Sequence, residues 1–337
     1  MAGFLVRRVL WILLVLLAVA TTTFVLMHRA PGGPWDRQKP IPAQVRENLN
    51  ARFGLDKPLW LNTDAVGAAW AGGTRDPRSL VSAAADSQFG TYLAGALRFD
   101  FGPSYQSRGS ESVRSVIADK VPVSAKVGII AVTSAVAAGV PLGVVSALRP
   151  RTWADHVVMV VTTVGMVVPA FVTGVLIVVV FSTWFGVSPL RQPEEWHGFS
   201  RAYLLPGLVL GLGAVAAITR VTRASVLESS HQDYVRTAEG KGLRRGRVVR
   251  SHILRNGLIP VVTLLGPLTA DLVAGSVIIE RIFGVPGLGR EFVTAISARD
   301  YPMIMGTTIF YAVLVAVANL MVDLSYGILD PRIRIRR

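Results

Sequence analysis

The residues of this chain that could do chemistry are polar groups set inside long apolar runs. Asn319, Asp323, Tyr326 and Asp330 are spaced four, three and four residues apart, which places them on one face of a helix. Asp271 stands alone in another apolar run. A carboxylate at membrane depth costs about 2.5–3.5 kcal/mol on insertion scales unless it faces protein or water. We therefore expect Asp271, Asp323 and Asn319 to face a translocation path or gate, with a structural hydrogen bond as the alternative, which we favour for Asp323.

The usual catalytic and nucleotide-binding motifs are missing from the sequence. It contains neither a Gly-x-x-x-x-Gly-Lys-Ser/Thr loop to hold phosphates nor a Gly-x-Ser-x-Gly nucleophile elbow. Its five histidines never pair with an acid at metal-ligand spacing, and the chain has no cysteine. We expect a chain without enzyme activity that binds no metal or cofactor, so that energy for any work must come from elsewhere.

The composition indicates a membrane protein. Of 337 residues, 51% are hydrophobic and 17% are charged, whereas a soluble protein carries about 25% charged residues. The net charge of +14 is compatible with nucleic-acid binding, but the basic residues gather at the ends of apolar runs. We therefore expect lipid as a partner and no nucleic acid.

Six apolar runs are long enough to cross a hydrocarbon core, which takes about 20 helical residues. The first run continues to Met27, longer than the core of a cleaved signal peptide, so we expect residues 1–27 to hold a retained first helix. The sequence thus predicts an all-α integral membrane protein whose six transmembrane helices lie at about 9–27, 123–148, 157–182, 203–219, 257–279 and 304–329.

Charge predicts the orientation of these helices. The segment 220–255 contains nine Lys or Arg, and the chain ends in another basic cluster. By the positive-inside rule both termini and this loop are cytoplasmic, and the long segment 28–121 is external. Within it, residues 61–89 are rich in small and polar residues, and we expect an insertion that is partly disordered. Residues 122–337 would form the core with the other five helices.

The basic loop contains a short polar helix. Ser230 followed by Asp233 is a capping-box signal for a helix start, and Gly240 and Gly242 can end a helix in the left-handed conformation. The expected helix, about 231–239, is too short to be stable alone. It therefore needs a partner surface.

This loop resembles a known family. Arg236-Thr237-Ala238 followed by Gly242 is similar to the Glu-Ala-Ala-x-x-x-Gly coupling loop of ATP-binding-cassette (ABC) importer permeases, from which it departs at Arg236 and Thr237. The sequence Tyr-Val-Arg-Thr-Ala-x-x-Lys-Gly-Leu resembles the peptide/nickel branch, in particular the B-type subunit of oligopeptide or dipeptide permeases. Further segments whose sequences resemble this branch are 30–34, 53–58, 100–104, 122–126, 283–289, 299–302 and 330–334.

The resemblance implies a type I ABC importer permease in the inner (plasma) membrane of a prokaryote. It implies a heterodimer with a second, homologous permease, two cytoplasmic ATPase subunits that use ATP and Mg, and an extracytoplasmic binding protein that delivers oligopeptides. We expect Tyr234 and Ala238 to be the contacts buried against an ATPase. The full ATPase-coupling set is Asp233, Tyr234, Arg236, Thr237, Ala238 and Gly242, and the external mouth is expected at Phe283, Pro286, Gly287 and Gly289.

Alternatives from other classes stay open at this point. An ATP-independent secondary transporter or channel would use Asp271 and Asp323 to couple to an ion gradient. An ABC permease for nickel or another small solute would share the same branch. An intramembrane enzyme would need a nucleophile–base pair or metal site, for which the sequence has no candidate.

Overall fold

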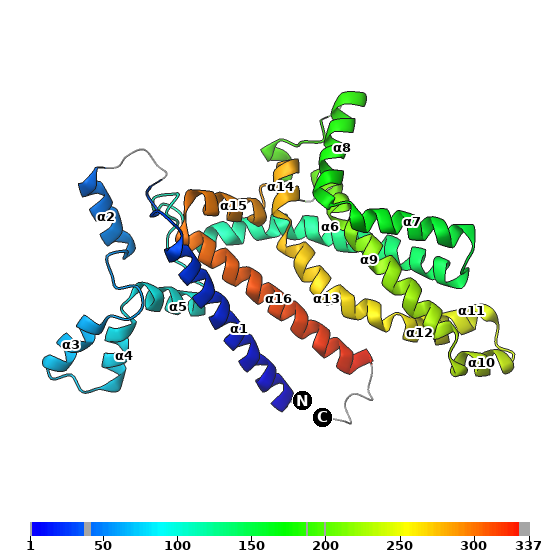
Figure 1. Ribbon diagram of the computed structural model, residues 1–337, viewed down its shortest axis with the longest axis horizontal. Helices are drawn as coiled ribbons and strands as arrows, with labels where there is room; N and C mark the ends of the chain where they lie inside the picture. The colour runs from blue at the N-terminus through cyan, green and yellow to red at the C-terminus, as the bar shows by residue number, and fades with distance from the viewer. Residues whose placement is uncertain (1, 37–41, 187, 199, 330–337) are drawn as a thin grey trace. The chain divides into compact units, whose positions relative to one another are not determined.

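The computed structural model describes residues 2–36, 42–186, 188–198 and 200–329 (Figure 1). In these ranges the regular secondary structure is helical, apart from one isolated β-bridge between Pro103 and Ser112. The chain divides into two compact units. Unit 1 comprises Met1–Asp119 and Phe292–Val313, and unit 2 comprises Lys120–Glu291 and Leu314–Arg337.

Four single helices and two bent helix pairs of the described chain are apolar and long enough to cross a membrane. If each bent pair is one span, their number agrees with the six predicted runs. The single helices are α1 (Ala2–Arg29), α6 (Val113–Leu148), α9 (Leu204–Ser230) and α16 (Tyr301–Leu329), and the bent pairs join α7 (Trp153–Val167) to α8 (Ala170–Trp184) and Arg245–Gly257 to Ile259–Val273.

The third predicted span is not the single straight helix that the sequence suggested. The axes of α7 and α8 meet at 97°. Val168 has extended backbone angles (φ −78°, ψ 116°), as expected for a residue before a proline, and Pro169 then precedes the first turn of α8. The two residues therefore break the helix near the middle of this apolar run.

The segment 61–89 is helical, which corrects our expectation of partial disorder. It contains α3 (Thr63–Ala71) and α4 (Pro77–Ala85), and it leads into α5 (Gln88–Arg98). Side chains of Asn62, Asp76 and Ser87 cap the three helices by accepting backbone N–H groups. Helix α2 (Ala43–Phe53) precedes this segment in unit 1.

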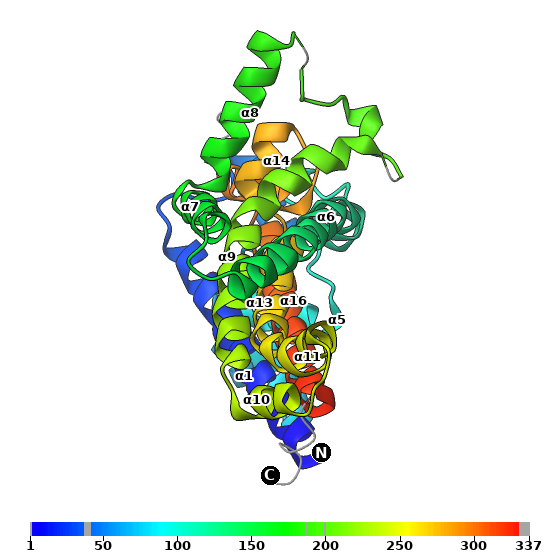
Figure 2. The same cartoon turned by 90° about the vertical axis from the view of Figure 1, so that its right-hand side faces the viewer.

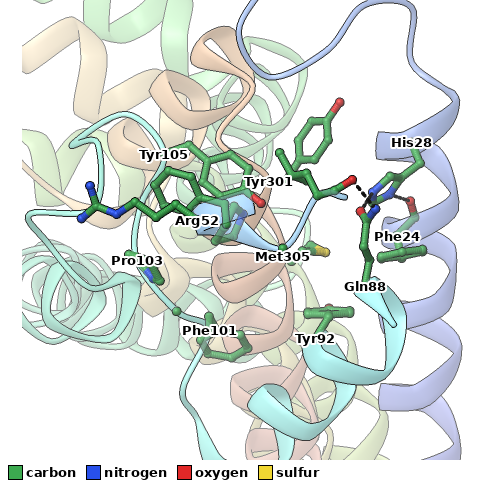
Figure 3. Close-up of a pocket in the computed structure, with 15 residues that line it drawn as sticks. Phe24, His28, Arg52, Gln88, Tyr92, Phe101, Pro103, Tyr105, Tyr301 and Met305 are labelled. Carbon is green, nitrogen blue, oxygen red and sulfur yellow. Dashed lines mark hydrogen bonds between the residues drawn. The ribbon is translucent and has the colours of Figure 1, made fainter. Parts of the chain in front are cut away.

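An aromatic core holds unit 1 together. Phe24 of α1, Tyr92 of α5 and Tyr301 of α16 belong to one buried cluster beside a cavity of about 170 Å³ (Figure 3). Asp300, before the first residue of α16, accepts hydrogen bonds from the Ser104 hydroxyl and from the backbone N–H of Gln106. These contacts fix the start of α16 against the segment that follows α5.

Small residues bring α6 and α9 close together in unit 2. A Cβ added at Gly139 would lie 2.9 Å from Ile218, and one at Gly143 would lie 2.5 Å from Thr222. From the other helix, Gly207 and Gly211 meet α6 equally closely. The two small-residue patterns therefore pack helices, as such patterns do in membranes.

The remaining elements of unit 2 are short helices around these long ones. Two 3₁₀ turns, η1 (Pro193–Trp196) and η2 (Arg201–Tyr203), precede α9. After α9 come α10 (Asp233–Gly240), α11 (Arg245–Val248), a π-helical turn η3 (Val249–Ile253), α12 (Leu254–Gly257), α13 (Ile259–Ala274) and α14 (Val277–Phe283). Helix α15 (Leu288–Ala298) follows.

Candidate functional site

The short polar helix predicted in the basic loop is α10, and it rests on the chain's own core. Val235 and Ala238, three residues apart, are 2% and 4% exposed. They pack in one cluster with buried side chains from α6, α9, α11 and η3. Figures 1 and 2 show α10 and α11 side by side beyond the end of α9. The chain therefore supplies the partner surface that so short a helix needs.

The other faces of α10 are open to solvent. Asp233, Arg236 and Thr237 are exposed, and within the described part of the chain their close side-chain contacts are local ones. The Asp233 carboxylate lies 3.9 Å from the Arg236 guanidinium, and the Thr237 hydroxyl donates to the Asp233 carbonyl. An exposed pair of this kind contributes little to stability. These side chains are accessible to a partner.

Ala238 lies differently from our expectation. We paired Tyr234 with Ala238 as two contacts buried against an ATPase, but Ala238 faces the chain's own core, together with Val235. Tyr234 is 38% exposed and stands on the partly open side. Ala238 thus seats α10 on the chain, and its small size sets how closely α10 can approach the helices that form this cluster.

The start of α10 also differs from the predicted capping box. Ser230 is the last residue of α9, and its hydroxyl donates to the Leu227 carbonyl of that helix. Gln232 precedes α10 without a side-chain cap. Asp233 is in the first turn, where its negative charge interacts favourably with the helix dipole. The capping-box reading was wrong because α9 runs further than the apolar pattern suggested.

Helix α10 ends at Gly240, which does not adopt the predicted left-handed conformation, whereas Gly242 does. The Gly242 φ of +76° is in the left-handed region, which other residues adopt at a cost. Its N–H donates to the Glu239 carbonyl at 2.9 Å. A Cβ at Gly242 would meet no atom within 4 Å, so the requirement for glycine is conformational and not steric.

Ser229 joins three elements at this site. Its hydroxyl lies 3.1 Å from the Ile253 carbonyl, to which it donates, and 2.7 Å from the Tyr234 hydroxyl. Because the Ser229 proton goes to the carbonyl, the Tyr234 hydroxyl acts as donor to Ser229 Oγ. This pair of hydrogen bonds ties the end of α9 to α10 and to η3.

A nearly continuous helical path leads from the site to α13. Helices α11, η3 and α12 follow one another without a gap, and their axis meets that of α13 at 47°. Pro260 lies in the first turn of α13, where its missing N–H is tolerated but a straight helix is not continued. Movement of α10 would therefore act on α13 through a short rigid arm.

The residues expected at the external mouth surround a buried carboxylate. Glu280 is fully buried and accepts hydrogen bonds from the Ser124 hydroxyl at 2.7 Å and the Arg290 N–H at 2.8 Å. A Cβ at Gly287 would lie 2.7 Å from Glu280 Cδ, and one at Gly289 would lie 3.0 Å from Glu280 Oε2. Burial raises the pKa of Glu280 from its ordinary value, against the opposing effect of these hydrogen bonds.

Phe283 is buried in the neighbouring cluster, and Pro286 is half-buried. The glycines of this motif therefore leave room for Glu280, which sequence reasoning missed. Its signal in the sequence was an acid three residues before Phe283, where the motif begins.

The polar residues of the spans are not brought to one site. Asp271 is exposed on α13. Asn319 and Asp323 are half-buried on α16, and Asp323 Oδ2 is enclosed. Tyr326 is in the same helix, and Asp330 lies outside the described residues. Their assignment to a translocation path stays a prediction.

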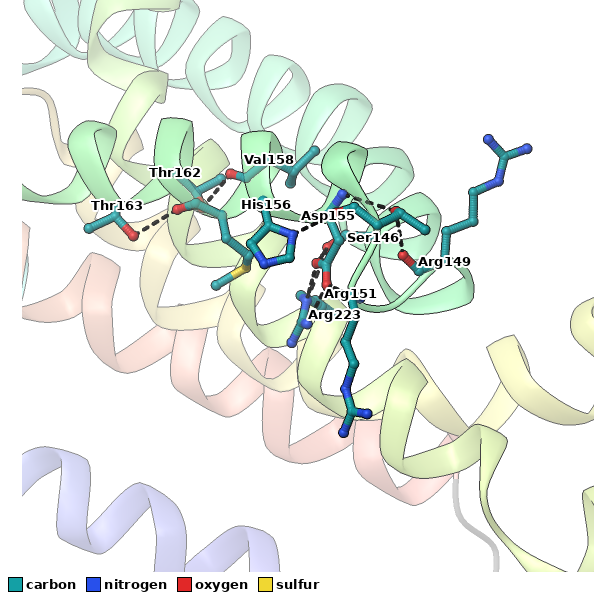
Figure 4. Close-up of polar contacts among 11 residues, drawn as sticks. Ser146, Arg149, Arg151, Asp155, His156, Val158, Thr162, Thr163 and Arg223 are labelled. Atoms are coloured by element: carbon teal, nitrogen blue, oxygen red, sulfur yellow. Dashed lines mark hydrogen bonds and ion pairs between the residues drawn. The ribbon is translucent and has the colours of Figure 1, made fainter.

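A second polar network, also missed from the sequence, holds α6, α7 and α9 (Figure 4). Asp155 accepts two hydrogen bonds from the Arg223 guanidinium, at 2.7 and 2.8 Å, one from the Ser146 hydroxyl and one from the Arg151 backbone N–H. A bidentate contact of this type is strong and directional. The sequence feature that could have indicated this network is Asp155, a lone acid in an apolar segment flanked by arginines.

Among the described residues, no group of three or more His, Asp or Glu side chains is placed to hold a metal ion.

Comparison with known proteins identifies the family. Residues 139–335 match the family described as binding-protein-dependent transport system inner membrane component. The whole chain is 36% identical to the dipeptide transport system permease protein DppB of Bacillus subtilis, covering 99% of that protein. Over 99% of its length it is 34% and 33% identical to the oligopeptide transport system permease proteins OppB of Haemophilus influenzae and Escherichia coli, each covered completely. This chain therefore belongs to the family of binding-protein-dependent transport system inner membrane components.

Proposed function

We propose that this chain is the permease subunit of an ATP-driven importer of peptides, forming half of the translocation pathway. Its full-length relatives are named for dipeptide and oligopeptide transport, which supports peptides as the substrate class. The observation that carries the coupling role is α10, a helix seated on the chain by two side chains while its remaining faces stay exposed.

The mechanism we propose starts at the exposed face of α10. When two ATPase subunits close on ATP and Mg, they push this face. The seat formed by Val235 and Ala238 and the Ser229 hydrogen bonds carry the push to η3 and α12. The bend before α13 then converts it into movement of that span, so that the pathway alternates between outward and inward access. The chain itself performs no catalysis.

The remaining partners follow from the family and the charge distribution. We propose that both termini and residues 220–255 are cytoplasmic, and that residues 28–121 face a substrate-binding protein outside. A second, homologous permease would complete the pathway. The secondary-transporter alternative is not favoured, because the family is one of binding-protein-dependent systems.

Co-purification tests this proposal. The tagged chain, extracted in mild detergent from its native membranes, should bring with it a second permease and two nucleotide-binding subunits, identified by mass spectrometry. Gly242→Asp should reduce recovery of the nucleotide-binding subunits while the permease pair persists. A homo-oligomer without ATPases, under conditions that preserve a known ABC complex, would overturn the proposal.

A further inference from the structure

A groove of about 450 Å³ runs between α7 and α9 of unit 2. One end is polar, with Arg151, Asp155, His156 and Arg223 in its lining. Along α7 the lining becomes mostly apolar, at Met159, Val160 and Val164, and the hydroxyl of Thr163 between them donates to the Met159 carbonyl. The groove thus has a cationic end and an apolar body. These two parts suit the anionic head group and the apolar acyl chains of a phospholipid.

The cationic end carries positive charge that the protein leaves unmatched. Asp155 is buried, and its carboxylate is already satisfied by Arg223, Ser146 and the Arg151 backbone. In Figure 4 the side chain of Arg151, which lines the groove, extends away from this carboxylate. The Arg151 guanidinium has no acidic partner among the described residues, since Asp155 is paired with Arg223. An anion at this end would meet cations without displacing an existing ion pair.

The backbone of Arg151 is in a conformation that glycine adopts more easily. Its φ is +62°, in the left-handed region, which is unfavourable for a residue with a side chain. Its N–H donates to Asp155 at 2.9 Å, which holds the turn in place. The strained conformation thus presents a guanidinium at the mouth of the groove.

The length and exposure of the groove fit one leaflet of a bilayer. From Trp153 to Val164, α7 rises about 16 Å, close to half of a hydrocarbon core of about 30 Å. Trp153 at the cationic end is 80% exposed, as is typical of an interfacial tryptophan. Val160 and Val164 are 63% and 55% exposed and would be covered by an acyl chain.

We propose that this groove is a binding site for an anionic phospholipid, with its phosphate held by Arg151 and the free Nη1 edge of Arg223 and an acyl chain laid along α7. Planar guanidinium groups bind phosphate oxygens through directed, charge-assisted hydrogen bonds. Basic pockets beside membrane helices are known sites for anionic head groups. The proposal requires that α7 runs across one leaflet of the membrane, and it does not depend on the transported substrate.

Native mass spectrometry of the intact transporter from nanodiscs tests the site. In discs of phosphatidylglycerol and phosphatidylethanolamine, the complex should retain phosphatidylglycerol preferentially. Arg151→Gly keeps the turn geometry and removes the guanidinium, and it should weaken this retention about tenfold, equivalent to about 1.4 kcal/mol. Arg108→Gly is the matched control, because Arg108 is also an exposed arginine with positive φ (+53°). It should leave retention unchanged.

Cross-linking identifies what occupies the groove. A photo-reactive amino acid in place of Val160 should label phospholipid in the assembled complex. Labelling of the second permease would overturn the proposal, as would equal retention of both lipids or unchanged retention in Arg151→Gly. If soluble glycerol phosphate at millimolar concentration displaces phosphatidylglycerol, the site recognises the phosphate group alone. That result would also overturn the proposal. None of these readouts depends on uptake, so they separate this site from the proposed transport function.

Discussion

The Tyr234 hydroxyl lies 2.7 Å from Ser229 Oγ, so the candidate coupling helix is hydrogen-bonded to the end of the span that precedes it. Ser229 also donates to the Ile253 carbonyl, in the segment that connects α10 with α13. One serine thus closes a loop of more than twenty residues at its base. In the proposed mechanism, this contact would transmit a force applied to α10 to the segment that leads to α13.

Removing the hydroxyl of Tyr234 should weaken this connection. Tyr234→Phe loses one hydrogen bond, worth about 0.5–1.5 kcal/mol, and should lower ATP-driven peptide uptake in proteoliposomes without reducing the amount of inserted protein. Tyr234→Ala also removes the ring and should abolish uptake. Ser229→Ala loses both hydrogen bonds and should be more severe than Tyr234→Phe. Wild-type uptake in Tyr234→Ala would remove this residue from the coupling assignment.

Gly242 should be sensitive to any side chain. Gly242→Ala forces a left-handed alanine at a cost of roughly 1–2 kcal/mol, although the space around it is empty. We expect ATP hydrolysis that is no longer matched by uptake, measured together in proteoliposomes. Gly246→Ala is the control, because Gly246 is helical, close in sequence and equally open, so alanine should be neutral or stabilising there. Equal behaviour of the two variants would contradict the conformational argument.

The seat of α10 should not tolerate a larger side chain. Ala238→Leu overpacks a buried position, at a cost of about 1–3 kcal/mol, and should lift α10 from the chain. Faster amide hydrogen exchange confined to α10 and η3 would report this. Thr237→Leu, at an exposed neighbour, should leave exchange unchanged. If both substitutions give the same exchange pattern, Ala238 does not seat the helix.

The sequence predicted the positions of the spans and of the short helix along the chain, because both depend on local patterns. Apolar length identified the six candidate spans, and glycine chemistry identified the end of α10. The break at Val168–Pro169 was missed because the run remains apolar across it, although the proline was a readable signal.

The polar networks were out of reach for a different reason. Asp155 meets Arg223, 68 residues away, and Ser124 meets Glu280, 156 residues away. No single segment shows such pairs. The burial of Ala238 was missed for a related reason, since the surface that covers it comes from helices distant in sequence.

Glu280 should make stability depend on pH. Its pKa is raised by burial from 4.5, so between pH 4.5 and the raised value the folded chain binds more protons than the unfolded chain. Its contribution to stability is therefore complete below pH 4.5 and is lost as pH rises through the raised pKa. The melting temperature of the detergent-solubilised complex should fall over this interval, and Glu280→Gln should flatten that fall. An unchanged pH profile in Glu280→Gln would show that another group is responsible.

Asp271 and Asp323 should respond differently to loss of charge, because one is exposed and the other has an enclosed oxygen. Asp271→Asn should keep the melting temperature and, if Asp271 lines the pathway, should change which peptides are taken up according to their charge. Asp323→Asn should lower the melting temperature, because a buried oxygen is replaced by an amide donor that must find an acceptor. Uptake by both variants should still require ATP and remain indifferent to a collapsed ion gradient. If collapsing the gradient stops uptake by the wild type while either substitution removes that sensitivity, these aspartates couple to ions, and the ATP-driven mechanism fails.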